Sequence, residues 1–238
     1  MRNIVRRFQR TGSTSLRGRP QRVAETGGGN QPPMTTSSAS SYVLGLTGNI
    51  AVGKTTVLRK LADLGAHTID ADVVYRDLSA PGTPLLAMLA DRFGADILAA
   101  DGSLDRTALG AIVFSDPDAL RDLDHLTHPA VIAEIDRQVA EVSDGVVVID
   151  AVKLIESGHA DHCDEVWVVT TDTKTQVTRL MQRTILSEVE ARRRVDAQPP
   201  VGPKLARADR VIDNSGTLDT TMAQVTAGWR EIMFMLCD

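Results

Sequence analysis

The segment 48–55, GNIAVGKT, has the residue types and spacing most directly suited to chemistry. It matches the G-x-x-x-x-G-K-[ST] pattern of a loop that binds nucleotide phosphates. In such a loop, backbone N–H groups and the positive end of the following helix surround the phosphate oxygens. The Lys54 ammonium would contact the β- and γ-phosphates, and the Thr55 hydroxyl would bind Mg²⁺. We predict that the following residues bind the nucleotide: Gly48, Asn49, Ile50, Ala51, Val52, Gly53, Lys54, Thr55 and Thr56.

Two carboxylates, Asp70 and Asp72, follow a short apolar stretch at 66–69. Ligands of open parallel sheets bind beyond the carboxyl ends of the strands, where these acids would lie. Phosphoryl transfer to an alcohol needs a carboxylate to accept the hydroxyl proton and acids to hold Mg²⁺. The alternative role for Asp72 is a helix N-cap. Because alternate side chains of an extended chain point to opposite sides, we expect different roles for the two acids.

Asp150 and the arginines of 179–194 allow two interpretations each, whereas the histidines allow one. Asp150, which follows the apolar run 146–149, could support a metal ion or be an ordinary acid at a strand end. The arginines of 179–194 could belong to a lid that closes over the transferring phosphate, or to a solvated helix face paired with Glu188 and Glu190. They are Arg179, Arg183, Arg192, Arg193 and Arg194. The histidines His67, His125, His159 and His162 have no ligand-like spacing, so we predict structural roles for them.

The elements that must position these residues alternate between strands and helices. Apolar runs predict strands at 42–46, 66–69, 146–149, 165–170 and 210–212. Helical spacing predicts helices at 56–64, 85–93, 106–114, 117–142, 173–183, 187–198 and 218–236, with one more ending at Leu78. We expect the helix 117–142 to be interrupted near His128-Pro129, because proline disfavours helix at the preceding residue. The pattern predicts an α/β fold with a doubly wound parallel five-stranded sheet, a helical substrate-binding insertion at 84–143 and a helical lid at 184–203.

Composition and charge exclude several function classes. Residues 1–40 hold seven arginines and one acid, a net charge of +6, so the remainder carries −11. An acidic body argues against a nucleic-acid-binding surface, and no apolar run approaches the length of a membrane span. Two distant cysteines fit a reducing, cytoplasmic compartment. We predict a kinase domain at 41–238, preceded by a disordered Arg/Ser/Gly-rich extension at 1–40; a transit peptide and a translation start at Met34 are the alternatives.

Several segments together resemble the dephospho-coenzyme A kinase family. They are LGLTGNIAVGKTTV, LADLGAHTIDADVVYRDL, PGTPLLAMLADRFGADILAADGSLDRTALGAIVFSD, LTHPAV and QPPVGPKLARADRVIDNSG, in the family's order. The resemblance implies a P-loop kinase fold. It also implies transfer of the ATP γ-phosphate to the ribose 3′-hydroxyl of dephospho-coenzyme A with Mg²⁺, by a monomer or weak homo-oligomer.

The resemblance also implies roles for single residues. Asp72 would be the base, and Asp70 would support it or the metal, although the opposite assignment stays open. Lys54 and Arg179 would assist catalysis. The remaining positions that match are Arg106, His128 and Glu156 for the substrate and Asn214 and Arg179 for ATP.

The sequence departs from the family at two places and leaves two other functions open. Asn49, Ala51 and Val52 replace Gly, Gly and Ser of the family loop, and Val152-Lys153 stand where the family has Pro-Leu. A kinase for another nucleotide-like alcohol is therefore one alternative. The other is a regulatory nucleotide switch, which would need a guanine-reading N-K-x-D segment that the sequence lacks.

Overall fold

The computed structural model describes residues 41–237 of the chain, which fall within one compact unit. The predictions for residues 1–40, including the disordered extension and the start at Met34, lie outside the described residues.

The centre of this part is a parallel five-stranded sheet with the strand order β2-β3-β1-β4-β5. Its strands are β1 (Tyr42–Thr47), β2 (His67–Asp70), β3 (Val146–Asp150), β4 (Glu165–Thr170) and β5 (Arg210–Asp213). All four strand pairs are parallel. The predicted α/β class and parallel sheet are therefore confirmed. The chain winds to opposite sides of β1, so the ligand-binding switch point of such a sheet lies at its carboxyl end.

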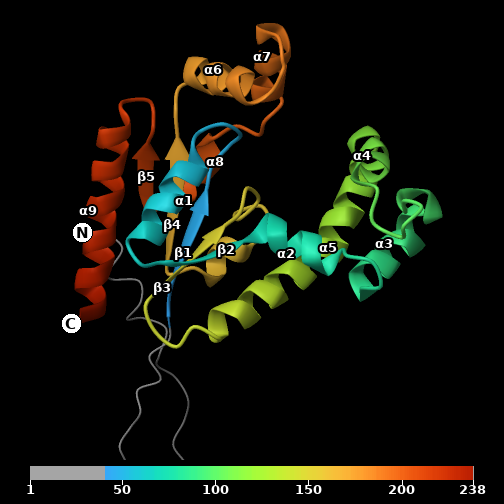
Figure 1. Ribbon diagram of the computed structural model, residues 1–238, viewed down its shortest axis with the longest axis horizontal. Coiled ribbons are helices and arrows are strands. Elements are labelled where there is room, and N and C mark those ends of the chain that lie inside the picture. The colour runs from blue at the N-terminus through green and yellow to red at the C-terminus, as the bar shows by residue number, and fades with distance from the viewer. Residues whose placement is uncertain (1–40, 238) are drawn as a thin grey trace, which may run out of the picture. The chain divides into compact units, whose positions relative to one another are not determined.

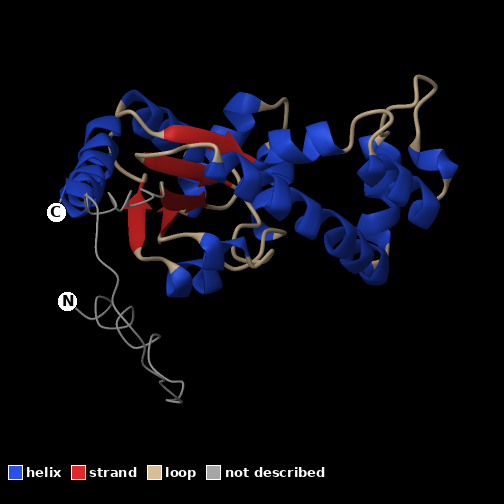
Figure 2. Cartoon of the chain, turned by 90° about the horizontal axis from the view of Figure 1, so that it is seen from below, coloured by secondary structure: helices blue, strands red, loops and turns tan. Residues whose placement is uncertain are grey.

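Both faces of the sheet are buried, which explains the nearly continuous apolar runs of its strands. Along β3 the side chains of Val146 and Val148 pack on one face, and those of Val147 and Ile149 pack on the other. The first face is covered by α1 (Lys54–Asp63) and α9 (Leu218–Cys237), which add Leu61 and Trp229, respectively, to the core on that side. The second face is covered by α2 (Ala71–Leu78) and the end of α5 (Pro117–Ala140). The sheet thus lies between two helical layers (Figure 2).

Two helical groups extend from this core. Between α2 and β3 the chain forms α3 (Pro84–Phe93), the 3₁₀ turn η2 (Ala95–Ile97), α4 (Arg106–Ser115) and α5, with a small apolar core of their own. After β4 it forms α6 (Thr173–Arg183), α7 (Glu188–Asp196) and α8 (Gly202–Arg207). In Figure 1, α3 and α4 lie at the far end of α5, and α6 and α7 lie beyond the arrowhead of β4. A capping box of Ser187 and Glu190 begins α7, as the sequence predicts.

The predicted interruption at His128-Pro129 is wrong, because α5 continues through Pro129. The helix packs into apolar clusters on both sides of the proline, through Ala119 toward α4 and through Ile135 toward the sheet. Burial at both ends holds the helix together where one backbone hydrogen bond is missing. Within residues 41–237, no helix has the length and apolar character to cross a membrane.

Candidate active site

The loop between β1 and α1 contains the predicted phosphate-binding residues. Gly53 has φ +95° and immediately precedes α1, so the loop ends in a left-handed turn that glycine adopts without strain. A Cβ on Gly53 would lie 2.0 Å from Nδ2 of Asn214, and a Cβ on Gly48 would lie 2.6 Å from the carbonyl oxygen of Val169. Close backbone packing therefore requires glycine at both ends of the loop.

Side chains from three distant segments hold this loop in shape. The carbonyl of Val52 accepts hydrogen bonds from Nη1 of Arg179 at 3.0 Å and from Nδ2 of Asn214 at 2.8 Å. Gln176 donates to the carbonyl of Ile50 at 2.9 Å, and Asn49 donates to the carbonyl of Pro199 at 3.1 Å. The loop is thus fixed to α6, to the turn after β5 and to the segment that follows α7.

The loop departs from ideal geometry at Ala51, which has φ +59° and is the non-glycine residue of the described chain with positive φ. A left-handed conformation costs an ordinary L-residue roughly 1–2 kcal/mol. The Ala51 methyl is buried beside Val177 and Leu180 of α6 and Ala191 of α7. Packing against α6 and α7 therefore offsets the backbone strain at Ala51.

Three carboxylates surround the start of α1. Lys54 forms an ion pair with Asp150, whose side chain is only 10% exposed. In the paired strands Asp70 lies opposite Asp150, so the acids of β2 and β3 meet at the carboxyl edge of the sheet. Burial raises the pKa of Asp150, the Lys54 ammonium opposes this rise, and the nearby charges of Asp70 and Asp72 add to it. This environment is suited to a cation that would neutralise the acids, and of the two interpretations of Asp150 it favours metal support.

Asp70 and Asp72 differ in their surroundings, but not as the sequence suggested. Asp70 is the N-cap of α2, and its Oδ1 accepts hydrogen bonds from the backbone N–H groups of Asp72 and Val73. The alternative that made Asp72 the cap is therefore wrong. The argument from an extended chain is also wrong, because Asp72 already lies in the first helical turn. Asp72 is exposed, and no residue of 41–237 bonds to its carboxylate, which leaves it available to a substrate hydroxyl.

Beside Asp72, a cavity of about 360 Å³ opens between α2, α5 and the segment after β3. Its lining is largely apolar, with polar side chains from Asp72, Tyr75, Asp124, His128, Lys153 and His159. Lys153 forms an ion pair with Asp124 at 2.7 Å, and His128 Nε2 lies 3.4 Å from the same carboxylate oxygen. Burial lowers the pKa of His128, so a neutral imidazole is favoured there at physiological pH.

The remaining predicted substrate residues lie at the borders of this region. The guanidinium of Arg106 stacks over the Tyr75 ring at 5.1 Å and donates to the hydroxyl of Ser79 at 3.3 Å. Glu156 accepts hydrogen bonds from Nζ of the buried Lys204 at 2.7 and 2.9 Å. Arg106 is thus adjacent to a cavity-lining aromatic ring, whereas Glu156 is engaged by a lysine.

The structure brings the loop, Lys54, Asp70, Asp72, Asp150 and the cavity together. Thr55 is exposed in the first turn of α1, and within the described chain nothing bonds to its hydroxyl. Asn214 is buried, and it holds the loop while accepting from Thr221 at 2.9 Å.

Sequence reasoning missed four residues of the site. Asp124 precedes His128 by four residues on one helix, a spacing that could have identified it. Gln176 and Lys204 act through contacts between distant segments and had no local signal, whereas Lys153 was noted only as a departure from the family.

The comparisons with known proteins find similarity to one family. The model of the family described as "Dephospho-CoA kinase" matches residues 42–220. A dephospho-CoA kinase of Symbiobacterium thermophilum is 50% identical over 191 residues, covering 79% of this chain and 80% of that protein. One of Geobacter metallireducens is 46% identical, covering 79% of this chain and 96% of that protein.

Solved structures show the same likeness. A crystal structure of a Thermus thermophilus protein has a TM-score of 0.69 at 28% identity and covers 80% of this chain and 97% of its own. A dephospho-CoA kinase from Campylobacter jejuni has a TM-score of 0.54 at 26% identity and covers 82% of this chain and 98% of its own.

Proposed function

The chain belongs to the dephospho-CoA kinase family, and we propose on this basis that it transfers the γ-phosphate of ATP to the ribose 3′-hydroxyl of dephospho-coenzyme A. This is the final step of coenzyme A synthesis. The observation that carries the proposal is the position of Asp72. Its carboxylate has no partner among residues 41–237 and lines a mainly apolar cavity, and its charge acts on Asp150, the partner of Lys54. A base at a cavity, close to the lysine of a phosphate loop, suits transfer between a nucleotide and an alcohol.

Each group of residues has its own role in the proposed reaction. The loop 48–55 and the N-terminus of α1 bind the triphosphate, and Lys54 leaves Asp150 to contact the γ-phosphate. Asp72 accepts the 3′-hydroxyl proton while the new O–P bond forms and the bond between the γ-phosphorus and the bridging oxygen breaks, so that ADP leaves. Arg179 and Asn214 hold the loop from behind. Phosphoryl transfer is accelerated mostly by positioning and electrostatics, which this arrangement supplies.

Mg²⁺ is the metal ion that the site would hold. Thr55 and Asp70 would bind it directly or through water, with Asp150 beside them, because hydroxyl and carboxylate oxygens are its preferred ligands. The ion would neutralise charge on the phosphates during transfer. The buried, acid-rich position of Asp150 supports this assignment, since its charge needs a cationic partner once Lys54 turns to the nucleotide.

The acceptor would lie in the cavity between α2 and α5. Residues 84–143 would form the substrate-binding insertion, with Arg106 and His128 toward the acceptor, and residues 184–203 would form the lid. The acidic charge of residues 41–238 supports a small-molecule substrate rather than nucleic acid. We also propose a cytoplasmic enzyme that is a monomer or weak homo-oligomer, for which the support is the sequence and the family.

The proposal is tested by comparing several possible acceptors of the phosphate. ADP release from Mg·ATP is measured with dephospho-coenzyme A, adenosine or ADP-ribose, and without acceptor. We expect the highest kcat/KM with dephospho-coenzyme A and little release without acceptor. Lys54→Ala is the matched control and should lose turnover; because Lys54 also pairs with the buried Asp150, its melting curve is measured to confirm that the variant stays folded. A higher kcat/KM for another acceptor would instead indicate that the Val152-Lys153 segment has changed specificity.

A further inference from the structure

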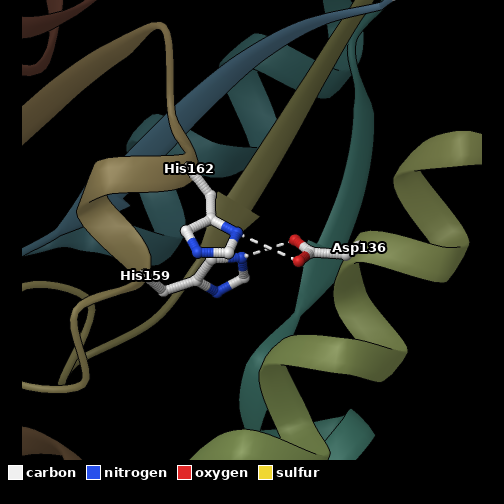
Figure 3. A group of neighbouring side chains, drawn as sticks. All are labelled: Asp136, His159 and His162. Carbon is white, nitrogen blue, oxygen red and sulfur yellow. Dashed lines mark hydrogen bonds and ion pairs between the residues drawn. The ribbon is translucent and has the colours of Figure 1, made fainter.

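One cluster of polar side chains has no part in the proposed reaction. Asp136 of α5 lies beside His159 and His162, which are the first and last residues of the 3₁₀ turn η3 (His159–His162). His159 Nε2 is 3.2 Å from Oδ1 of Asp136, and His162 Nδ1 is 3.0 Å from Oδ2. Figure 3 shows both rings directed at the one carboxylate from the same side.

The shape of the cluster suits a metal ion. One nitrogen or oxygen atom from each of the three residues lies within 4.8 Å of the others. Zinc bonds of about 2.0–2.1 Å to nitrogen and oxygen in a tetrahedron place neighbouring ligand atoms roughly 3.3 Å apart. The two histidine–carboxylate distances are already close to that value. The rings stand at 88° to each other with their centroids 5.2 Å apart, and each directs one ring nitrogen at the carboxylate.

We propose that Asp136, His159 and His162 bind a divalent transition-metal ion of the Zn²⁺ class, with water completing the coordination. Two imidazoles and a carboxylate favour zinc, cobalt or nickel over Mg²⁺, which prefers oxygen ligands. On binding, the ring hydrogens that now face Asp136 move to the other nitrogen of each imidazole. The metal takes their place between the rings and the carboxylate.

The position of the site defines what the ion would do. His159 is almost fully buried and also lines the cavity beside Asp72, whereas Asp136 and His162 are about half exposed. An ion could therefore enter from the Asp136–His162 side. Once bound, it would join α5 to the segment after β3, which form two walls of that cavity. The role is therefore structural, and the metal should raise the melting temperature of the protein.

The test is a competition titration of the untagged full chain with Zn²⁺ against a chromophoric chelator. Excess Mg²⁺ is present to occupy the acids near the phosphate loop, and Cys237→Ser is the background, because the exposed Cys237 thiol could bind zinc itself. Two variants remove ligands: His162→Ala and Asp136→Asn. His67→Ala, which changes an exposed histidine of β2, is the matched control.

We expect one equivalent of Zn²⁺, a higher melting temperature with zinc, and visible absorption from bound Co²⁺ typical of four or five ligands. His162→Ala and Asp136→Asn should each weaken zinc binding at least about tenfold, and His67→Ala should leave it unchanged. Both ligands are partly exposed, so the variants should fold, which melting curves without zinc check. A parent chain that binds zinc no more tightly than these two variants would overturn the proposal.

Discussion

At the scale of single residues, Asp70 and Asp72 lie two positions apart but have different surroundings. Asp70 caps α2 and faces Asp150 across the strand pair, whereas Asp72 is exposed at the cavity. The Oδ1 atom of Asp70 is already engaged by two backbone N–H groups, so this carboxylate is less free to turn toward a substrate hydroxyl. The structure thus supports Asp72 as the base and Asp70 as the acid that serves the helix and the metal.

Substitutions of these two acids test that division. Asp72→Asn should lower kcat by about 10²- to 10⁴-fold without changing the melting temperature, because it removes only the base. Asp70→Asn should keep the cap, since Asn caps helices as well as Asp, and its activity should be partly restored by raising Mg²⁺. Asp70→Ala should in addition lose about 1 kcal/mol of stability.

The measurements are kcat across a Mg²⁺ series and thermal or denaturant unfolding of each variant. A fast Asp72→Asn enzyme beside an inactive Asp70→Asn enzyme that does not respond to Mg²⁺ would reverse the two roles.

The structure also changes the role that we expect for the Arg179 side chain. The sequence indicated a lid arginine that acts mainly in the transition state, yet its guanidinium bonds to the carbonyls of Val52 and Asn214. We expect Arg179→Ala to raise KM for ATP and to lower the free energy of unfolding by about 1–2 kcal/mol, because two backbone carbonyls, one in the loop and one in the turn after β5, lose a charged donor. Arg179→Lys should not restore both bonds, since lysine lacks the planar two-pronged donor.

Arg183→Ala is the control for Arg179, because Arg183 is exposed at the end of the same helix. Steady-state kinetics and denaturant unfolding of both variants measure the changes in KM and in stability. If Arg179→Ala lowered kcat alone, with unchanged stability and KM, the arginine would act on the transition state as the sequence suggested.

At the scale of elements, α8 is connected to the segment after β3 through Lys204. Its Nζ is buried and bonds to both carboxylate oxygens of Glu156 and to the carbonyl of Val152 at 2.8 Å. The contact joins the residue that follows the predicted lid (184–203) to a wall of the cavity beside Asp72, because Val152 lines that cavity. Because Glu156 is partly exposed and Lys204 is not, the two partners should respond differently to substitution.

We predict that Glu156→Gln is more destabilising than Lys204→Met. The first leaves a buried ammonium without its counter-charge and should cost about 3 kcal/mol, whereas the second leaves a carboxylate that water can reach and should cost roughly 1–2 kcal/mol. Urea unfolding of both variants measures the difference. Equal losses, or a larger loss for Lys204→Met, would mean that the packing of the lysine stem matters more than the charge.

The sequence could predict the strands, but it could not predict every helix. The strands were predictable because both faces of the sheet are buried, which gives runs such as VVVI at 146–149. The short helix α8 was not predicted, because six residues after Pro199-Pro200 are too few to show a helical period. The continuity of α5 through Pro129 depends on packing at both of its ends, which local sequence does not reveal.

For the site, the sequence could predict the loop and the acids because each lies at the end of a strand, where the fold brings them together. It could not decide which acid caps α2, since that depends on where the helix begins. The supports of the loop, including Gln176 and the strained Ala51, arise from contacts between α6, α7 and residues that are over a hundred positions away. Such contacts have no local signal.

At the scale of the whole molecule, the central claim is that the phosphate loop and Asp72 act on one acceptor held between them. The direct measurement is the position of the new phosphate. The chain is incubated with Mg·ATP and either dephospho-coenzyme A or its 3′-deoxy analogue, and the products are identified by ³¹P NMR and mass spectrometry. We expect one 3′-phosphorylated product for each ADP released, and no acceptor-dependent ADP with the analogue. Phosphate at another position, or equal ADP release with the analogue, would contradict the central claim.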